Sequence, residues 1–522
     1  MLISKNKKAL ILRLRDPSLI TAVIPKSKVF QYKGKELVAV KHGVEEVKVL
    51  RNLGINAPSP IKYYYAWPGR FKPFMAQRET ADFLVSNRRA FCLNDLGTGK
   101  TLAVLWAFDY LRSLGLVRKM FVVSPLSTLE RTWADEIWQH FPHLECAVLY
   151  GSAEKRMKML SQDADIYLIN HDGLKIPGLV EALKDRDDVD LIVVDEISQA
   201  ARNASTDRFR ALNTIINKQQ PRWAWGLSGT PIPNKPTDAW AQCRLLTPER
   251  VPPYFNRFRD MVERQVTQFL WVPRPNALDV VHEAMQPAIR FSRDDCVDLP
   301  PCQYVSRQIE LTPAQKKAYK DMMTKLKAEI EEGQVTAVNE AVKAQKLIQI
   351  ACGALYGEDR EILEVDAKPR LDEVCEIVND CAHKVIVFVP FISTLNIVAK
   401  RLRDEGFEVE CIHGGVSKTE RDRIFGAFQK QANPRVLVAQ PAAMSHGLTL
   451  TAASTIVWYA PITSADTFVQ ANGRITRPSQ KNNQLIIMIE GTEIERRYYA
   501  RLSKKQKVQG TLLQMVKDAA MT

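Results

Sequence analysis

The sequence Asn-Asp-Leu-Gly-Thr-Gly-Lys-Thr at residues 94–101 has the residue types that bind phosphate groups. An apolar run precedes it and a helical pattern follows it. Its two glycines allow the tight turn that points backbone N–H groups at phosphate oxygens, Lys100 supplies a cation, and the Thr101 hydroxyl can hold Mg²⁺. The helix that starts here adds its positive end. The general pattern begins with glycine and this loop begins with Asn94, so a chance glycine-rich turn is the alternative.

A second acidic site lies downstream, where residues 191–196 read Leu-Ile-Val-Val-Asp-Glu. At the carboxyl end of a parallel strand beside the phosphate loop, Asp195 would reach Mg²⁺ and Glu196 would orient and deprotonate the attacking water. Acidic residues after an apolar strand are common, so the evidence is the pairing of the two motifs. Phosphoryl transfer needs positioning and charge neutralisation, and the pair supplies both. We therefore predict ATP hydrolysis, with ATP and Mg²⁺ as cofactors.

Apolar strand-like runs alternate with helical segments in two series, which predicts parallel strands with ligands at their carboxyl ends. The predicted strands of the first series lie near Phe91 and at 119–124, 147–150, 165–170, 191–195 and 223–228; those of the second lie at 385–389, 408–412, 436–439, 455–459 and 485–489. The second series has no phosphate loop. We expect an α/β fold of two parallel-sheet lobes in tandem, the second closing over phosphates bound by the first.

Two further segments differ in character from these lobes. Proline clusters and a charged helical stretch from Pro313 to about Glu332 indicate a helical insertion and linker, and β-prone runs with a helix around 44–53 indicate a small basic α+β module at the N-terminus. The predicted division is residues 1–70 for the small module, 71–247 for the ATP-binding lobe, 248–366 for the insertion and linker, and 367–522 for the second lobe.

The amino-acid composition limits the classes of protein to which the chain can belong. The 522 residues are 46% hydrophobic and 25% charged, as in globular proteins. No apolar stretch approaches the ~18 residues that span a bilayer, and the start lacks a signal-peptide pattern, so we expect a cytoplasmic protein. The nine cysteines include no C-x-x-C pair, which argues against a disulfide framework or a zinc site. The net charge of +14 favours a polyanionic partner, although a solvated charged surface is the alternative.

Beyond the loop and the acidic pair, further motifs follow in a fixed order. They are Gln77 in Lys-Pro-Phe-Met-Ala-Gln-Arg, Ser124-Pro-Leu, Asp195-Glu-Ile-Ser, Gly226-Leu-Ser-Gly-Thr-Pro-Ile-Pro-Asn234, the connector Arg290–Pro301, Lys384–Phe391, His413-Gly-Gly-Val, His446–Thr451 and Gln470–Arg477. This set resembles superfamily 2 helicases and, within them, the Swi/Snf-type double-stranded DNA translocases. The resemblance covers roughly residues 70–515 and implies two RecA-like lobes.

The resemblance also implies a role for individual residues. Catalytic roles fall on Lys100, Asp195, Glu196, Arg474 and Arg477; nucleotide binding on Gln77, Asp95, Leu96, Gly97, Thr98, Gly99, Lys100, Thr101 and Gln470; metal binding on Thr101 and Asp195; DNA contacts on Ser124, Thr128, His171, Asn203, Gly447 and Thr449; coupling of hydrolysis to movement on Ser228, Gly229 and Thr230. Arg474 and Arg477 are expected on a helix after the predicted strand at 455–459. Plainer alternatives are an exposed helical polar residue for Gln77, a strand-to-turn junction for 228–230, and a solvated helix face for the two arginines.

Three positions depart from the family pattern. Ser198 and Thr476 replace frequent histidines, and residues 444–446 read Met-Ser-His where glycines are usual. The first seventy residues faintly resemble the HARP-type modules of annealing helicases, which implies either a reader of DNA structure or a structural cap. The compact length, without a chromatin-reading module or nuclease motif, is more similar to phage or bacterial members than to nucleosome remodellers.

The sequence therefore predicts a DNA-dependent ATPase that tracks along duplex DNA. It would remodel branched or protein-bound DNA in replication, recombination or repair, and we expect a monomer without a membrane partner. A strand-separating DNA or RNA helicase is the alternative within enzymes. An ATP-switched clamp that binds DNA without sustained turnover is the alternative from another class.

Overall fold

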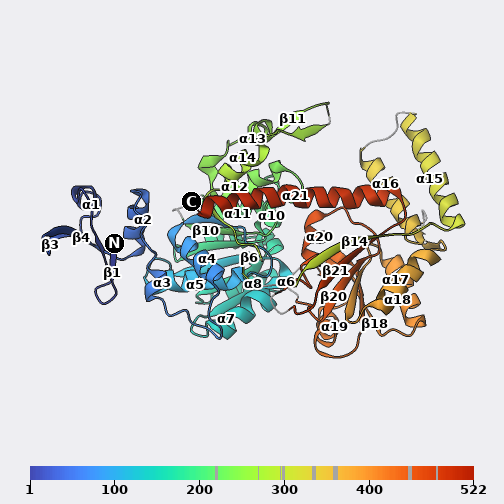
Figure 1. Cartoon of the computed structure of the whole chain (residues 1–522), viewed down its shortest axis with the longest axis horizontal. Coiled ribbons are helices and arrows are strands. Elements are labelled where there is room, and N and C mark those ends of the chain that lie inside the picture. Colours follow the sequence, from blue (N-terminus) through green and yellow to red (C-terminus); the bar gives the residue numbers. More distant parts are fainter. Residues whose placement is uncertain are drawn as a thin grey trace. The chain divides into compact units, whose positions relative to one another are not determined.

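The computed structural model describes the chain apart from residues 218–221, 269, 294, 297–299, 332–336, 357–361, 445–448, 478–479 and 522. It contains two compact units (Figure 1). The first is Met1–Cys296 with Leu512–Thr522, and the second is Val297–Thr511. Residues 248–296, predicted as insertion and linker, thus lie in the first unit. The predicted four-part division otherwise stays a prediction.

The N-terminal module is a small antiparallel sheet with a helix. Its strands are β1 (Leu2–Ser4), β2 (Ala9–Leu12), β3 (Lys28–Tyr32) and β4 (Lys35–Lys41), in the order β1-β2-β4-β3, with helices α1 (Ser18–Thr21) and α2 (Val44–Asn52). Alternate residues of β4, Val38 and Val40, are buried against Val47 and Leu50 of α2. This period of two is what a half-buried strand requires. The predicted β-prone runs and helix are confirmed.

The main sheet of the first unit is parallel throughout. Its order is β13-β5-β10-β9-β6-β8-β7, with β5 (Arg89–Cys92), β6 (Lys119–Ser124), β7 (Cys146–Leu149), β8 (Ile166–Asn170), β9 (Val189–Asp195), β10 (Trp223–Leu227) and β13 (Ala288–Ile289). The six predicted strands are confirmed. The sequence did not predict β13, which extends the sheet beyond β5.

Helices connect these strands and flank the sheet (Figure 1). They are α3 (Ile61–Tyr64), α4 (Met75–Ser86), α5 (Lys100–Ser113), α6 (Leu126–Thr128), a π-helical turn (Leu129–Ala134), α7 (Asp135–His140), α8 (Ala153–Leu160), α9 (Leu179–Lys184), α10 (Ile197–Ala200), α11 (Asp207–Asn217), α12 (Ala239–Leu246), α13 (Phe255–Val262) and α14 (Ala277–Ala284), with short 3₁₀ turns at His171–Lys175, Pro236–Asp238 and Pro248–Arg250 and a hairpin of β11 (Glu263–Gln265) and β12 (Trp271–Pro273). Because both faces are covered, the central strands are continuously apolar.

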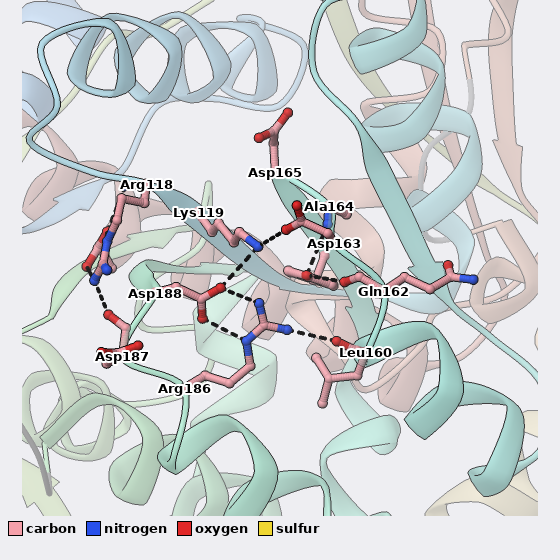
Figure 2. Close-up of polar contacts among 12 residues, drawn as sticks. Arg118, Lys119, Leu160, Gln162, Asp163, Ala164, Asp165, Arg186, Asp187 and Asp188 are labelled. Atoms are coloured by element: carbon pink, nitrogen blue, oxygen red, sulfur yellow. Dashed lines mark hydrogen bonds and ion pairs between the residues drawn. The ribbon is translucent and has the colours of Figure 1, made fainter.

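Ion pairs fasten the amino edge of this sheet (Figure 2). The first residue of β6, Lys119, pairs with Asp163 and, at 3.0 Å, with Asp188, which lies one residue before β9. Arg186 donates to both carboxylate oxygens of Asp188, at 2.8 and 2.5 Å, and to the Leu160 carbonyl at 2.8 Å. The Arg186 hydrogen bonds and Lys119 hold the pKa of Asp188 well below its usual range. The charged groups therefore stabilise the edge opposite the phosphate loop.

The second unit is built on a second parallel sheet, in the order β14-β21-β20-β17-β19-β18. Its strands are β14 (Cys302–Gln308), β17 (Lys384–Phe388), β18 (Val409–Ile412), β19 (Val436–Ala439), β20 (Ala453–Trp458) and β21 (Gln484–Glu490); its helices are α15 (Pro313–Glu331), α16 (Ala337–Ala351), α17 (Lys368–Asp380), α18 (Ile392–Asp404), α19 (Lys418–Lys430), α20 (Ala465–Asn472) and α21 (Glu493–Met521), with a 3₁₀ turn at Pro441–Met444 and a hairpin of β15 (Ala354–Tyr356) and β16 (Ile362–Glu364). The five predicted strands and the charged helix are confirmed.

The predicted fold class, two parallel-sheet lobes with a small N-terminal α+β module, is therefore confirmed. The edge strand β14 was not predicted, because most of its residues are exposed and carry no apolar pattern. Across the part of the chain that the structure describes, no helix has the length and apolar character to cross a bilayer.

Candidate active site

The phosphate loop has the strand–loop–helix setting that its sequence predicts. Strand β5 ends at Cys92 and α5 begins at Lys100. Gly97 and Gly99 take φ angles of 86° and 75°, in the left-handed region that strains other residues. The loop therefore folds as a tight turn onto a helix N-terminus, the arrangement in which backbone N–H groups bind an anion.

The Lys100 side chain is held in place by backbone carbonyls of the phosphate loop. Its ammonium group donates to the carbonyls of Asn94 at 2.9 Å and Asp95 at 3.1 Å. The loop is braced further by Thr98, whose hydroxyl donates to the Asp95 carbonyl at 2.8 Å. Thr101, the next residue of α5, is partly exposed. A cation and a hydroxyl thus stand together at the start of the helix, as the motif predicts.

Gln77 lies against the loop from α4. It is 5% exposed, so the alternative of an exposed helical residue is wrong. Its side-chain oxygen accepts a hydrogen bond from the Phe74 backbone N–H at 2.9 Å. A methyl group on Gly99 would come within 2.0 Å of the Gln77 side-chain nitrogen, so Gly99 is required for space as well as for its φ angle. Adenine recognition by Gln77 stays a prediction.

The acidic pair lies at the carboxyl end of β9, two strands from β5. The Asp195 carboxylate accepts hydrogen bonds from the Trp133 indole at 3.0 Å and from the Glu196 backbone at 3.1 Å. Burial raises the pKa of Asp195, although the Trp133 hydrogen bond and the charge on Lys100 act against that shift. Glu196 has a φ of 50°, a strained angle for a residue with a side chain. Strained backbone of this kind is concentrated at functional sites.

Hydrogen bonds join the acidic pair to the segment after β10. The Ser198 and Ser228 hydroxyls lie 3.0 Å apart, and the Ser228 hydroxyl accepts from the Thr230 backbone at 3.0 Å. On the other side, a methyl group on Gly229 would lie 3.5 Å from the Leu96 backbone nitrogen, which is ordinary contact distance. The phosphate loop, the acidic pair and the 228–230 segment therefore form one continuous set. Their coupling role stays a prediction.

The residues predicted to contact DNA fall into three groups. Ser124, Thr128 and His171 are buried. His171 shares a hydrogen bond with the Asp195 carbonyl at 2.9 Å, and burial lowers its pKa to about 4, so it is neutral near pH 7. Asn203 and Thr449 are exposed. Gly447 lies outside the described residues, as do residues 445 and 446 of the Met-Ser-His segment.

In the second unit, the two arginines follow α20. The expectation that they lie on a helix is wrong, because α20 ends at Asn472 and Gly473 stops it. Arg474 is 2% exposed, which excludes a solvated face for it, and its carbonyl accepts from the Leu450 backbone at 3.0 Å. Arg477 is partly exposed. Gln470 is buried on α20 and donates to Asp466 at 3.1 Å. The catalytic role of the arginines stays a prediction.

Two further residues of the site were not predicted from the sequence. Trp133 donates to Asp195 from a π-helical turn 62 residues earlier, and no motif marks it. Arg290 donates to Asp95 at 2.7 Å from a segment that the sequence assigns to the linker. Only the fold brings Trp133 to Asp195 and Arg290 to the phosphate loop.

Two family descriptions match the chain. "SNF2-related domain" matches residues 74–354, and "Helicase conserved C-terminal domain" matches residues 369–479. A relative in Acyrthosiphon pisum secondary endosymbiont phage 1, "Putative protein p41", is 28% identical over 417 residues, which are 73% of this chain and 83% of that protein.

Other relatives are longer than this chain. An "Uncharacterized ATP-dependent helicase" of Mycoplasma pneumoniae is 24% identical over 81% of this chain and 40% of its own length. The human "DNA annealing helicase and endonuclease ZRANB3" is 23% identical over 82% of this chain and 39% of its own length. Among solved structures, "Sulfolobus solfataricus SWI2/SNF2 ATPase core in complex with dsDNA" is 21% identical, with a TM-score of 0.42, over 86% of this chain and 96% of that one. The chain thus spans most of the phage protein and about two fifths of the other two relatives.

Proposed function

The chain belongs to the SNF2-related family and is a helicase-like, DNA-dependent ATPase. From this premise we propose that it is a motor that moves along duplex DNA. Its work would be the remodelling of branched or protein-bound DNA in replication, recombination or repair. The observation that carries the proposal is the hydrogen-bonded set at one sheet edge, in which the Ser198–Ser228 bond joins the acidic pair to the 228–230 segment. A motor needs such a link between hydrolysis and movement.

The chemistry assigned to the first unit uses few groups. Lys100 and the loop N–H groups would bind the phosphates of ATP, and Glu196 would orient and deprotonate the attacking water. Mg²⁺ fits the residues present, because Thr101 and Asp195 offer the hard oxygen donors it prefers and the Asp195 carboxyl is buried at the carboxyl end of β9. When bound, this ion neutralises phosphate charge.

The second unit would supply positive charge that stabilises the transition state of hydrolysis more than it stabilises bound ATP. Arg474 and Arg477 are proposed to stabilise the charge on the transferring phosphate, and Gln470 to support nucleotide binding. Such arginines act by a planar fork of N–H donors that lysine lacks.

Binding to the DNA backbone is proposed for residues of both units. Asn203 and Thr449 suit this role as described, since both are exposed. Ser124, Thr128 and His171 would require their neighbours to move, and Gly447 keeps the role that the resemblance implies. The basic N-terminal module, with exposed Lys5, Lys7, Lys26, Lys33 and Lys35, is proposed to read DNA structure. A monomer working in the cytoplasm is part of the same proposal.

The test is the ATPase rate with single-stranded, duplex, forked and RNA ligands at saturation. A duplex-tracking motor should be stimulated most by duplex and forked DNA. Stimulation by single strands or RNA alone would favour a strand-separating helicase. One hydrolysis per binding event, without sustained turnover, would favour the ATP-switched clamp.

A further inference from the structure

The side chains of Asn94 and Asp95 are hydrogen-bonded to the segment that follows β13. This segment, residues 290–293, is called the connector segment here, because the chain runs from it into the second unit. The Asn94 side-chain oxygen accepts from the Phe291 backbone at 2.8 Å, and the Asp95 backbone donates to the Phe291 carbonyl at 3.0 Å. The loop and the connector segment are therefore bonded through both backbone and side chains.

Asp95 carries the charged part of this connection. One carboxylate oxygen accepts from the Arg290 guanidinium at 2.7 Å, and the other accepts from the Arg293 backbone at 3.0 Å. The same guanidinium donates to the Leu93 carbonyl at 2.7 Å. Arg290 is 8% exposed. The Asp95 side chain is 26% exposed, so the pair is partly buried. A partly buried charge-assisted pair is stronger and more sensitive to geometry than a surface pair.

The side-chain contacts of Asn94 account for the replacement of the first glycine of the general pattern. Asn94 is 2% exposed and does not take the left-handed φ that would require glycine. Its amide nitrogen donates at 2.8 Å to the Thr80 hydroxyl, which itself donates to Ala76 on α4. The Asn94 side chain thus joins the phosphate loop to two elements, the helix that carries Gln77 and the connector segment. Glycine could make neither bond.

The end of α21 extends the same set. Asp295 accepts from the Ser292 backbone and hydroxyl, both at 2.7 Å, and from the Lys517 ammonium at 2.6 Å. Leu512 and Val516, which lie five residues and one residue before Lys517 on α21, are fully buried. The connector segment is therefore held on one side by the phosphate loop and on the other by α21.

We propose that Asn94, Asp95 and Arg290 are positioning residues for ATP hydrolysis, which lock the phosphate loop to the connector segment and carry its response to nucleotide into the chain leading to the second unit. The Asp95 side chain then affects hydrolysis by holding Arg290 and does not contact the nucleotide. The Asp95 backbone carbonyl affects hydrolysis by positioning the Lys100 ammonium group. The inference rests on ATP hydrolysis by this chain and not on movement along duplex DNA.

The first experiment compares steady-state ATPase in Asp95→Asn, Arg290→Met and the double variant, with and without saturating DNA. Each single variant should lower kcat at least about tenfold and change the KM for ATP far less, because small misplacements of the phosphates slow chemistry more than binding. The double variant should be no slower than the slower single variant, since the residues act as one unit. Asn94→Gly should lower kcat in the same direction.

Arg186→Met is the matched control, because Arg186 also forms a partly buried pair with an aspartate and a bond to a backbone carbonyl, but at the opposite edge of the sheet. It should keep wild-type kcat even if its melting temperature falls. Wild-type kcat in Asp95→Asn and Arg290→Met would overturn the proposal, as would additive losses in the double variant or an equal loss in Arg186→Met. If Arg290→Met does not fold, Asp95→Asn and Asn94→Gly decide alone. Absence of wild-type turnover would instead count against the proposed function.

The second experiment measures amide hydrogen exchange of the connector segment. The Phe291 and Arg293 amides donate to Asn94 and Asp95, so their exchange should slow when ADP or a non-hydrolysable ATP analogue binds with Mg²⁺. The change should be absent in Asp95→Asn at saturating nucleotide. Equal protection with and without nucleotide in the wild type would overturn the transmission part of the proposal.

Discussion

Replacing Gly99 by alanine tests whether the phosphate loop and Gln77 are fitted to each other. The new methyl group would lower the free energy of unfolding in two ways. Gly99 has a φ of 75°, and an L-residue there costs about 1–2 kcal/mol. The methyl group would also lie 2.0 Å from the Gln77 side-chain nitrogen, so Gln77 must rotate away and lose its hydrogen bond from the Phe74 N–H. That loss adds about 1 kcal/mol.

Gly115, just beyond the other end of the same helix, provides a matched control. It has a φ of 70°, and a methyl group there would meet nothing within 4 Å. Gly115→Ala should therefore show the backbone cost alone, about 1–2 kcal/mol, and leave ATP binding unchanged. The difference between the two variants isolates the contact between Gly99 and Gln77.

The assay is chemical denaturation together with an ATP-binding titration. Gly99→Ala should be about 1 kcal/mol less stable than Gly115→Ala and should bind ATP at least about tenfold more weakly, since the loop N–H groups no longer converge on phosphate. Adding Gln77→Ala to Gly99→Ala should cause little further destabilisation, because the hydrogen bond from the Phe74 N–H is already lost in Gly99→Ala. Equal stability of the two alanine variants, with wild-type ATP affinity in both, would refute the fit between loop and helix.

Three further predictions concern chemistry and stability. Glu196→Gln should bind ATP normally and stop hydrolysis in a single-turnover assay, whereas loss of ATP binding would assign Glu196 a structural role. Arg474→Ala and Arg477→Ala should each lower DNA-stimulated kcat by about 10³–10⁵ with little change in ATP affinity, and near-normal rates would contradict their proposed role in hydrolysis. Asp188→Asn should cost about 0.5–1 kcal/mol at pH 7. Because the folded-state pKa of Asp188 is lowered from an unfolded value near 4, this cost should shrink as pH falls below about 4, and a cost that grows in acid would refute the Arg186 pairing.

Local sequence patterns predicted the parts of the fold that follow from a regular spacing of residue types. The eleven strands and the phosphate loop follow apolar runs and glycine spacing, which depend on neighbours in the sequence. The two missed edge strands of the parallel sheets carry no such signal, since β13 has two residues and β14 is largely exposed. The end of α20 was misjudged although Gly473 is a common helix stop.

The candidate site was predictable where a motif carries it and not where the fold assembles it. Lys100 and Asp195 are recognised from the types and order of their neighbours. The partners Trp133 and Arg290 lie 62 and 195 residues away from the carboxylates that they contact. The spacing of such residues obeys no local period, so their role emerges only when parallel strands bring their carboxyl ends together.

The central claim is movement along duplex DNA driven by ATP hydrolysis at the loop of residues 94–101. The most direct measurement is displacement of a third strand from a duplex that carries a triplex block beyond a free duplex arm. We predict ATP-dependent displacement by the wild type, a lag that lengthens with the arm, and none by Lys100→Ala, which should keep the wild-type fold. Displacement that is absent in the wild type despite DNA-stimulated ATPase, or that proceeds equally in Lys100→Ala, would contradict the claim.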